Sequence, residues 1–151
     1  MPKAPKTNNF SEENLRQFLI MPKLLVVDDD YDVAMSFKIG LESNGFIVDI
    51  FTNPKLALST FKPGYYSLLL LDIRMPNMTG FELYNAISIV DRNVKVCFTT
   101  SFSIYYKSLK DQYHGIDQAC FISKPVLIDD LVAHIRNELN RKKTFLNLRQ
   151  D

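Results

Sequence analysis

The sequence predicts an α/β fold, a doubly wound parallel sheet of five strands with helices on both faces. Apolar runs without polar alternation, such as residues 24–27 and 68–71, are typical of strands buried on both faces of a parallel sheet. Helical patterns alternate with these runs along the chain, which indicates right-handed strand–helix–strand connections. Charged residues stand where three of the runs stop, and open parallel sheets bind ligands just outside the carboxyl ends of their strands.

The chain begins with an expected extension over residues 1–22. Within it, Ser11 can cap a short amphipathic helix whose apolar face carries Leu15, Phe18 and Leu19. The residues before Ser11 are polar and include lysines, so we expect them to be mobile.

Two strand–helix pairs follow the extension. The first strand is predicted over residues 23–27 and the next helix over 32–44, where Asn44-Gly45 is a favoured C-terminal stop. The second strand is predicted over residues 46–51. The helix after it begins at Asn53-Pro54, which supplies a cap and a proline at the first helical position. Leu56, Phe61 and the stop at Pro63-Gly64 define this helix.

Three further strands and three further helices alternate in the rest of the chain. The expected strands cover residues 67–71, 94–99 and 119–123. The expected helices cover residues 81–91, 103–112 and 128–143, and the last has an apolar stripe of Leu131, Ile135 and Leu139. We therefore predict an extension (1–22), one folded domain (23–141) and a basic C-terminal tail (142–151).

Composition excludes several classes of protein. A net charge of +1 gives no overall field that would favour nucleic acid or an anionic membrane. No apolar run approaches the roughly 20 residues that span a bilayer, and the N-terminus lacks the apolar core of a secretory signal, so we expect a cytoplasmic protein. Cys97 and Cys120 lie within apolar runs, as buried reduced thiols do, and His114 and His134 have no partner at metal-ligand spacing.

Charged and hydroxyl side chains at four strand ends predict a phosphoryl and metal site. Asp28 and Asp29 end the first expected strand, and Asp72 ends the third. Three neighbouring carboxylates repel each other, and a hard cation such as Mg²⁺ relieves that repulsion. Asp72 can then act as a nucleophile toward a phosphoryl donor, while Lys124 supplies a positive charge and Thr100 a hydroxyl donor.

Each of these residues also has a purely structural interpretation. An acid that follows a strand often caps the next helix, which applies to residues 28–30, and Asp72 could be a turn residue. Lys124 precedes a proline, as in many loops, and Thr100 could cap a helix. The functional interpretation depends on all four strand ends carrying suitable residues in a suitable order.

Four segments carry a resemblance to a known family. They are residues 24–30 (LLVVDDD), 70–80 (LLDIRMPNMTG), 99–101 (TTS) and 123–125 (SKP). Together they resemble the receiver domain of two-component response regulators, over roughly residues 22–140. The resemblance implies a flavodoxin-like sheet with the strand order 2-1-3-4-5.

The resemblance assigns the metal-binding and phosphoacceptor residues. Asp28 and Asp29 resemble the acid pair that binds Mg²⁺ (or Mn²⁺), and Asp72 resembles the phosphoacceptor. Asp72 and the backbone carbonyl of Arg74 would complete the protein ligands of the metal.

The resemblance also assigns a set of switch residues. Lys124 resembles the phosphate-binding lysine, and Phe121 resembles the aromatic residue that swings inward on activation. Thr99 and Thr100 compete for the role of the hydroxyl switch. We choose Thr100, because Ser101 then falls where the family has a small residue.

Two residues match positions that the family uses to tune loss of the phosphoryl group, Arg74 and Phe102. A bulky apolar side chain at position 102 would hinder an attacking water, so we expect slow dephosphorylation. The approach to the fifth strand, residues 115–119, follows helix 103–112 and is longer than the usual family pattern.

The resemblance implies a stand-alone, phosphorylation-controlled signalling switch rather than an enzyme. A histidine kinase or a phosphotransfer protein would supply the phosphoryl group. Phosphorylation would change the surface that the family calls the 4-5-5 face. In this chain that face comprises helix 103–112, strand 119–123 and helix 128–143. The change would alter binding of a downstream protein whose identity is unknown. A homodimer through the same face is left open, with Tyr105 as an exposed aromatic contact.

Three alternatives remain. The chain could be a DNA-binding regulator that acts through a dimer or through the basic tail, although no DNA-reading motif follows the last helix. It could be a receiver-like interaction module that works without phosphate. A phosphatase of the haloacid dehalogenase type fits poorly, because that family needs a second acid where this chain has Arg74.

Overall fold

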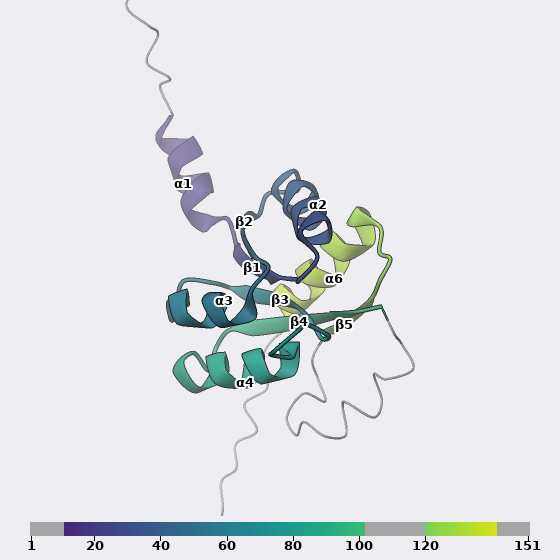
Figure 1. Ribbon diagram of the computed structural model, residues 1–151. Coiled ribbons are helices and arrows are strands. Elements are labelled where there is room, and N and C mark those ends of the chain that lie inside the picture. The colour runs from purple at the N-terminus through teal and green to yellow at the C-terminus, as the bar shows by residue number, and fades with distance from the viewer. Residues whose placement is uncertain (1–10, 102–119, 142–151) are drawn as a thin grey trace, which may run out of the picture.

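A five-stranded parallel sheet forms the centre of the protein in a computed structural model that describes residues 11–101 and 120–141 (Figure 1). The strand order is β2-β1-β3-β4-β5, which confirms the predicted α/β fold and its flavodoxin-like order. The strands are β1 (Lys23–Val27), β2 (Ile47–Phe51), β3 (Leu68–Asp72), β4 (Lys95–Thr100) and β5 (Cys120–Ser123).

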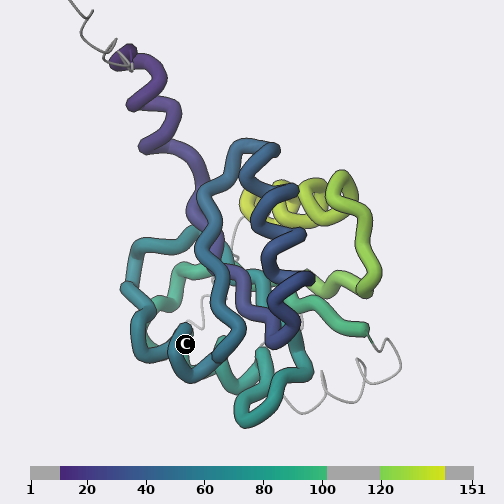
Figure 2. The backbone as a smooth tube through the Cα atoms, turned by 45° about the horizontal axis from the view of Figure 1, so that its top comes forward, coloured from purple at the N-terminus to yellow at the C-terminus, as the bar shows by residue number. Residues whose placement is uncertain are grey.

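Helices cover both faces of this sheet. The helices after α1 (Glu12–Ile20) are α2 (Tyr31–Glu42), α3 (Pro54–Thr60), α4 (Gly80–Val90) and α6 (Ile128–Asn140). Figures 1 and 2 show α2 and α6 on one face and α3 and α4 on the other. The predicted helix over residues 103–112 lies outside the described residues.

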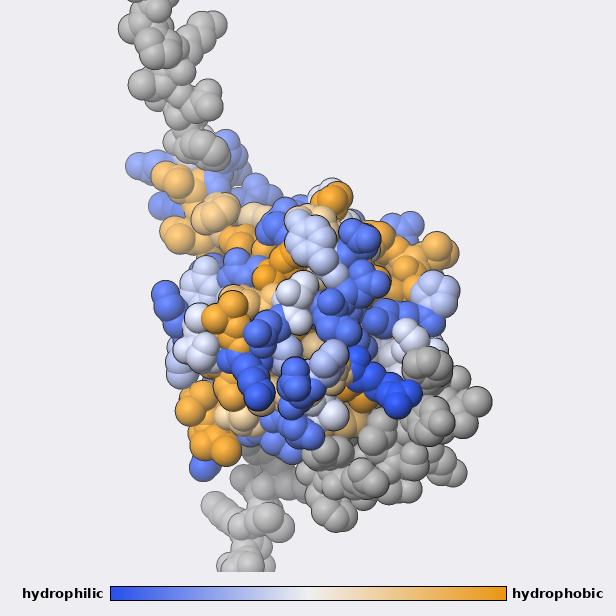
Figure 3. Space-filling view, viewed as in Figure 1, coloured by the Kyte–Doolittle hydropathy of each residue, from blue (hydrophilic) through white to orange (hydrophobic). Residues whose placement is uncertain are grey.

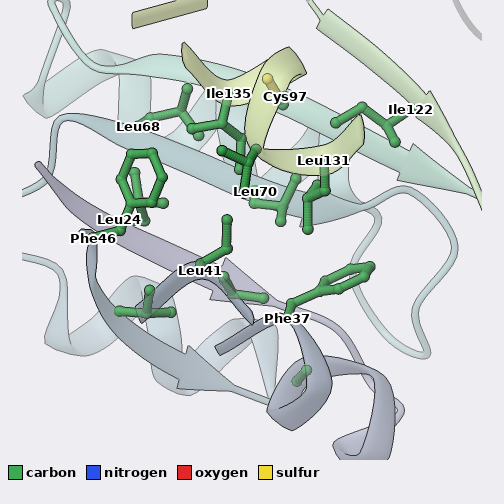
Figure 4. Close-up of a cluster of buried hydrophobic side chains, with 14 residues drawn as sticks. Leu24, Phe37, Leu41, Phe46, Leu68, Leu70, Cys97, Ile122, Leu131 and Ile135 are labelled. Atoms are coloured by element: carbon green, nitrogen blue, oxygen red, sulfur yellow. The ribbon is translucent and has the colours of Figure 1, made fainter. Parts of the chain in front are cut away.

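Two apolar clusters hold the helices on the sheet. One lies between the sheet and α2 and α6, and Figure 4 shows Leu24 and Leu70 of the sheet facing Phe37, Leu131 and Ile135 of these helices. The other cluster lies under α3 and α4. Because β1 and β3 have helices on both faces, their side chains are buried without alternation, as their apolar sequences predict.

Local signals in the sequence account for most helix ends. The Asp30 and Asn53 side chains accept hydrogen bonds from the first backbone N–H groups of α2 and α3, and Pro54 occupies the first turn of α3. Gly45, which follows α2, has a φ of 90° that suits glycine.

Three expectations about the elements need correction. Asp72 lies within β3 and Thr100 within β4, because Asp72 pairs with Thr99 of β4 and Thr100 pairs with Ser123 of β5. Helix α3 ends at Thr60, before Phe61 and the expected stop at Pro63-Gly64, and it buries Pro54 and Ala57 while Leu56 is exposed. The last helix ends at Asn140 rather than near residue 143, because Arg141 has an extended backbone.

Helix α1 forms as predicted but extends away from the sheet (Figure 1). The Ser11 side chain accepts a hydrogen bond from the Asn14 N–H at 3.2 Å. The apolar side chains of this helix are exposed, and orange side chains are visible on it in Figure 3. No helix among the described residues is long and apolar enough to cross a membrane.

Replacing Ile135 by alanine tests the packing of α6. Ile135 is completely buried in the cluster under α2 and α6, so Ile135→Ala should lower the free energy of unfolding by about 2–5 kcal/mol. Ile89 in α4 is 79% exposed and provides a matched control whose change to alanine should alter stability by less than about 0.5 kcal/mol. Urea unfolding measures both values, and equal losses in the two variants would contradict this packing.

Candidate functional site

Three carboxylates meet at the carboxyl edge of the sheet. Asp28 and Asp29 follow β1 and Asp72 ends β3, and one oxygen from each lies within 4.8 Å of the others. β1 and β3 are neighbours with Val27 opposite Leu71, so the residues that follow this pair necessarily lie close together. Asp28 and Asp72 are buried, whereas Asp29 is exposed. The structure thus brings together the three acids that the sequence singled out.

Hydrogen bonds hold the turn between β1 and α2 in place. The Asp28 N–H donates to the Phe51 carbonyl at 3.1 Å, and an Asp28 carboxylate oxygen accepts from the Asp30 N–H at 2.9 Å. The Asp30 side chain accepts from the N–H groups of Asp32 and Val33. Helix capping therefore explains Asp30, and the other two acids of this run belong to the carboxylate cluster.

Lys124 places a positive charge against two of the carboxylates. Its Nζ lies 2.9 Å from Asp28 Oδ2 and 3.5 Å from Asp72 Oδ1. The backbone positions this side chain, because the Lys124 N–H donates to the Thr100 carbonyl at 2.8 Å and so continues the pairing of β5 with β4. Burial alone would lower the pKa of Lys124, but the hydrogen bond to Asp28 and the charges of Asp72 and Asp28 raise it.

The carboxylate cluster carries excess negative charge. Burial, followed by the charge of Asp28, raises the pKa of Asp72 to about 7, although Lys124 opposes this shift. Among the described residues that contact the cluster, one ammonium faces three carboxylates. Carboxylate oxygens are the ligands that hard divalent cations prefer, so this donor set fits Mg²⁺.

An open pocket of about 730 Å³ surrounds the cluster. The predicted site residues that line it are Asp28, Asp29, Asp72, Arg74, Ser101 and Lys124. Its wall also includes Ser36 and Phe37 of α2, which the sequence analysis did not include in the site. The available signal was that α2 begins directly after residues 28–30, which places its first turns beside the acids.

The segment between Asp72 and Gly80 folds back onto the end of β3. The Ile73 N–H donates to the Thr99 carbonyl, and the Gly80 N–H donates to the Ile73 carbonyl, each at 3.0 Å. A Cβ atom at position 80 would collide with the carbonyl oxygen of Asp72. Glycine is therefore needed at position 80, so that α4 can begin against the backbone of Asp72.

The two adjacent threonines lie on opposite faces of the sheet. Side chains alternate along β4, with Cys97 in the cluster under α2 and α6 and Phe98 in the cluster under α3 and α4. Thr100 therefore shares the face of Phe98, and Thr99 shares the face of Cys97. Phe121 packs against the cluster that contains Phe98, so Thr100 is the threonine on the same face as this aromatic residue.

Phe121 belongs to an aromatic group rather than to the pocket wall. Its ring centroid lies 5.4 Å from that of Phe98 and 6.3 Å from that of Phe81. Of the described site residues, Thr99, Thr100 and Phe121 are not among those that line the pocket. Phe102 and Tyr105 lie outside the described residues.

Comparison with known proteins identifies the family. The model of the response regulator receiver domain matches residues 24–136. The chain belongs to this family. The receiver domain is 33% identical over 119 residues to the response regulator receiver protein CpdR of Brucella abortus, which covers 79% of the chain and 98% of CpdR. Over 123 residues it is 32% identical to the transcriptional regulatory protein PrrA of Mycobacterium tuberculosis, which covers 80% of the chain and 51% of PrrA.

The receiver domain also resembles solved structures. A receiver domain protein from Methanospirillum hungatei is 29% identical with a TM-score of 0.69, covering 79% of this chain and 94% of that one. The response regulator TrrA from Thermotoga maritima, solved in complex with Mg(2+)-BeF, is 28% identical with a TM-score of 0.67, covering 78% and 98%. The chain spans about half the length of PrrA, so this match concerns a receiver domain in two-component signalling and not the rest of that protein.

The raised pKa of Asp72 predicts that stability and Mg²⁺ affinity depend on pH. The pKa is 3.8 in the unfolded reference and about 7 in the folded protein, so the metal-free folded state holds the extra proton between these values. The free energy of unfolding should therefore fall as pH rises from about 4 to about 7. Mg²⁺ must displace that proton, so its affinity should fall by up to about tenfold per pH unit below 7.

Calorimetric titration with Mg²⁺ and urea unfolding at several pH values measure both effects. Asp72→Asn should abolish the dependence of stability on pH across this range, whereas the exposed Asp130→Asn should retain it. An Mg²⁺ affinity that is equal at pH 5.5 and pH 8 (conditions about 1 unit or more either side of the expected pKa) would contradict the assignment.

Proposed function

We propose that this receiver domain is a phosphorylation-controlled signalling switch in which Asp72 accepts a phosphoryl group from a histidine kinase or a phosphotransfer protein. The observation that carries the proposal is the arrangement around Asp72. Lys124 Nζ lies within 3.5 Å of oxygens of both Asp28 and Asp72, and Asp29 completes a cluster that fits a divalent cation.

Each residue of the site would have a separate role in phosphoryl transfer. A carboxylate oxygen of Asp72 attacks phosphorus, the P–N bond of the phosphohistidine breaks, and the released imidazole takes up a proton. Bound Mg²⁺ (or Mn²⁺), held by Asp28, Asp29, Asp72 and the Arg74 carbonyl, would neutralise phosphoryl oxygens. Lys124 already contacts Asp72 and can transfer its ion pair to the incoming phosphoryl group. The protein modifies itself and need not turn over a separate substrate.

Phosphorylation would then act on Thr100 and Phe121. The Thr100 hydroxyl can donate to a phosphoryl oxygen, and Phe121 shares its face of the sheet. Movement of both would shift a two-state equilibrium of the 4-5-5 face, of which β5 and α6 are described. The consequence would be binding or release of a downstream protein, in the cytoplasm where the kinase would act.

Acetyl phosphate provides a direct test of the phosphoacceptor. With Mg²⁺, the intact mass of the protein should increase by one phosphoryl group. Asp72→Asn and removal of Mg²⁺ by a chelator should each abolish the increase, because they remove the nucleophile or the cation that neutralises the phosphoryl oxygens. The exposed Asp130→Asn serves as the matched control and should be modified like the wild type.

Other results would favour the alternatives. A well-folded wild type that takes up no phosphoryl group would favour the phosphate-independent interaction module. A phosphorylated chain that binds duplex DNA with a strong dependence on salt would favour DNA-binding regulation, which agrees with the name of PrrA. The basic tail over residues 142–151, one proposed route to DNA, lies outside the described residues.

Replacing each of the two threonines by alanine, in separate variants, tests the switch. The probe is Mg²⁺ with beryllofluoride, because TrrA was solved in complex with Mg(2+)-BeF. Thr100→Ala should still bind the probe at Asp72, but the NMR signals of the Phe121 ring should shift less than in the wild type. Thr99→Ala places the same change on the opposite face and should leave that shift intact. Equal shifts in all three proteins would contradict a role for Thr100.

A further inference from the structure

The chain contains two cysteines, and they lie opposite each other on neighbouring strands. Cys97 of β4 pairs in register with Cys120, the first residue of β5. Both side chains belong to the face covered by α2 and α6, where Cys97 is buried and Cys120 is half-buried against the same cluster. Figure 4 shows the Cys97 sulfur beneath α6.

The geometry of the pair suits a covalent link. Neighbouring strands in a sheet lie about 4.8 Å apart, which falls inside the range of about 4.4–6.8 Å between the Cα atoms of a disulfide. The two thiols lie close enough for each to perturb the pKa of the other. In-register positions on these neighbouring strands therefore meet the Cα requirement for a disulfide.

The two thiols differ in reactivity. Hydrogen bonding from the Cys97 thiol, aided by the positive charge of Arg141, lowers the pKa of Cys120 against the opposing effects of burial and Glu138. The same hydrogen bond, together with burial, raises the pKa of Cys97. Cys120 is therefore the more acidic and the more exposed thiol, and these two properties mark the sulfur that an oxidant meets first.

We propose that Cys97 and Cys120 are a redox-sensitive pair, which a peroxide converts to a reversible disulfide between β4 and β5. The Cys120 thiol releases its proton, and the thiolate attacks one oxygen of hydrogen peroxide. The O–O bond breaks to give a sulfenic acid and a hydroxide, which takes up the released proton to form one water. The Cys97 thiol then displaces the sulfenic hydroxyl group as a second water. In total, two thiols and one hydrogen peroxide give one disulfide and two waters.

The disulfide would restrain the edge of the sheet. It would tie the first residue of β5 to β4, directly before Phe121, whose ring packs on Phe98. Oxidation would thereby limit movement of β5, which belongs to the 4-5-5 face. The chemistry of the cysteine pair needs none of the residues around Asp72, so this proposal can be tested independently of phosphorylation.

Intact-mass analysis of the reduced full-length chain during titration with hydrogen peroxide tests the proposal. The expected product is a monomer that is lighter by two hydrogen atoms, has lost both free thiols under denaturing conditions, and recovers them with dithiothreitol. Cys97→Ser should instead accumulate a sulfenic acid on Cys120 that dimedone traps. Should that variant not fold, trapping with dimedone during oxidation of the wild type provides the same readout.

A pair of arginine variants on or beside α6 tests the basis of reactivity. Arg141→Gln removes a cation that lowers the pKa of Cys120 and should slow disulfide formation several-fold. Arg136→Gln provides the matched control, because Arg136 donates to the Asn44 carbonyl and should not affect the rate. Persistence of both thiols, stable oxygen addition without loss of Cys97, or disulfide dimers between chains would each overturn the proposal.

Discussion

The pairing of β1 with β3 is the constraint on which the rest of the protein depends. Both strands are buried on both faces, so neither can carry a charged side chain within the paired run from Leu24 opposite Leu68 to Val27 opposite Leu71. Charge is tolerated only where the run ends, and the parallel direction puts both ends at the same edge. The hydrophobic core therefore determines where the acids can converge.

The close approach of the acids destabilises the folded protein, whereas the apolar core stabilises it. Asp28 and Asp72 are buried beside one another, and Lys124 compensates for only part of their charge. A carboxyl group whose pKa rises on folding weakens the folded state wherever it is ionised in the unfolded chain. A cation that binds at the cluster relieves this repulsion between carboxylates. Relief of the repulsion contributes to its binding free energy, and binding in turn stabilises the folded state.

The sequence was sufficient for the sheet and for the charged part of the site, because both follow from residue type and position. Apolar runs define β1 and β3, and Asp28, Asp72 and Lys124 stand at strand ends. The outward position of Leu56 could not be predicted, since α3 is too short for a clear apolar period. The sequence left Thr99 and Thr100 as neighbours with competing claims, and the placement of Cys97 and Phe98 in opposite clusters is what shows which face of the sheet each threonine occupies.

Packing offers a physical route from the site to the edge of the sheet. Gly80 lies against the backbone of Asp72, and the next residue, Phe81, packs on Phe98 with ring centroids 4.7 Å apart. Phe98 in turn packs on Phe121. Contiguous packing transmits a signal only if one member has two arrangements. Phe81 and Phe98 are fully buried and would leave a cavity if they moved, whereas Phe121 is half-buried on an edge strand, so Phe121 is the member of this group whose movement would cost least.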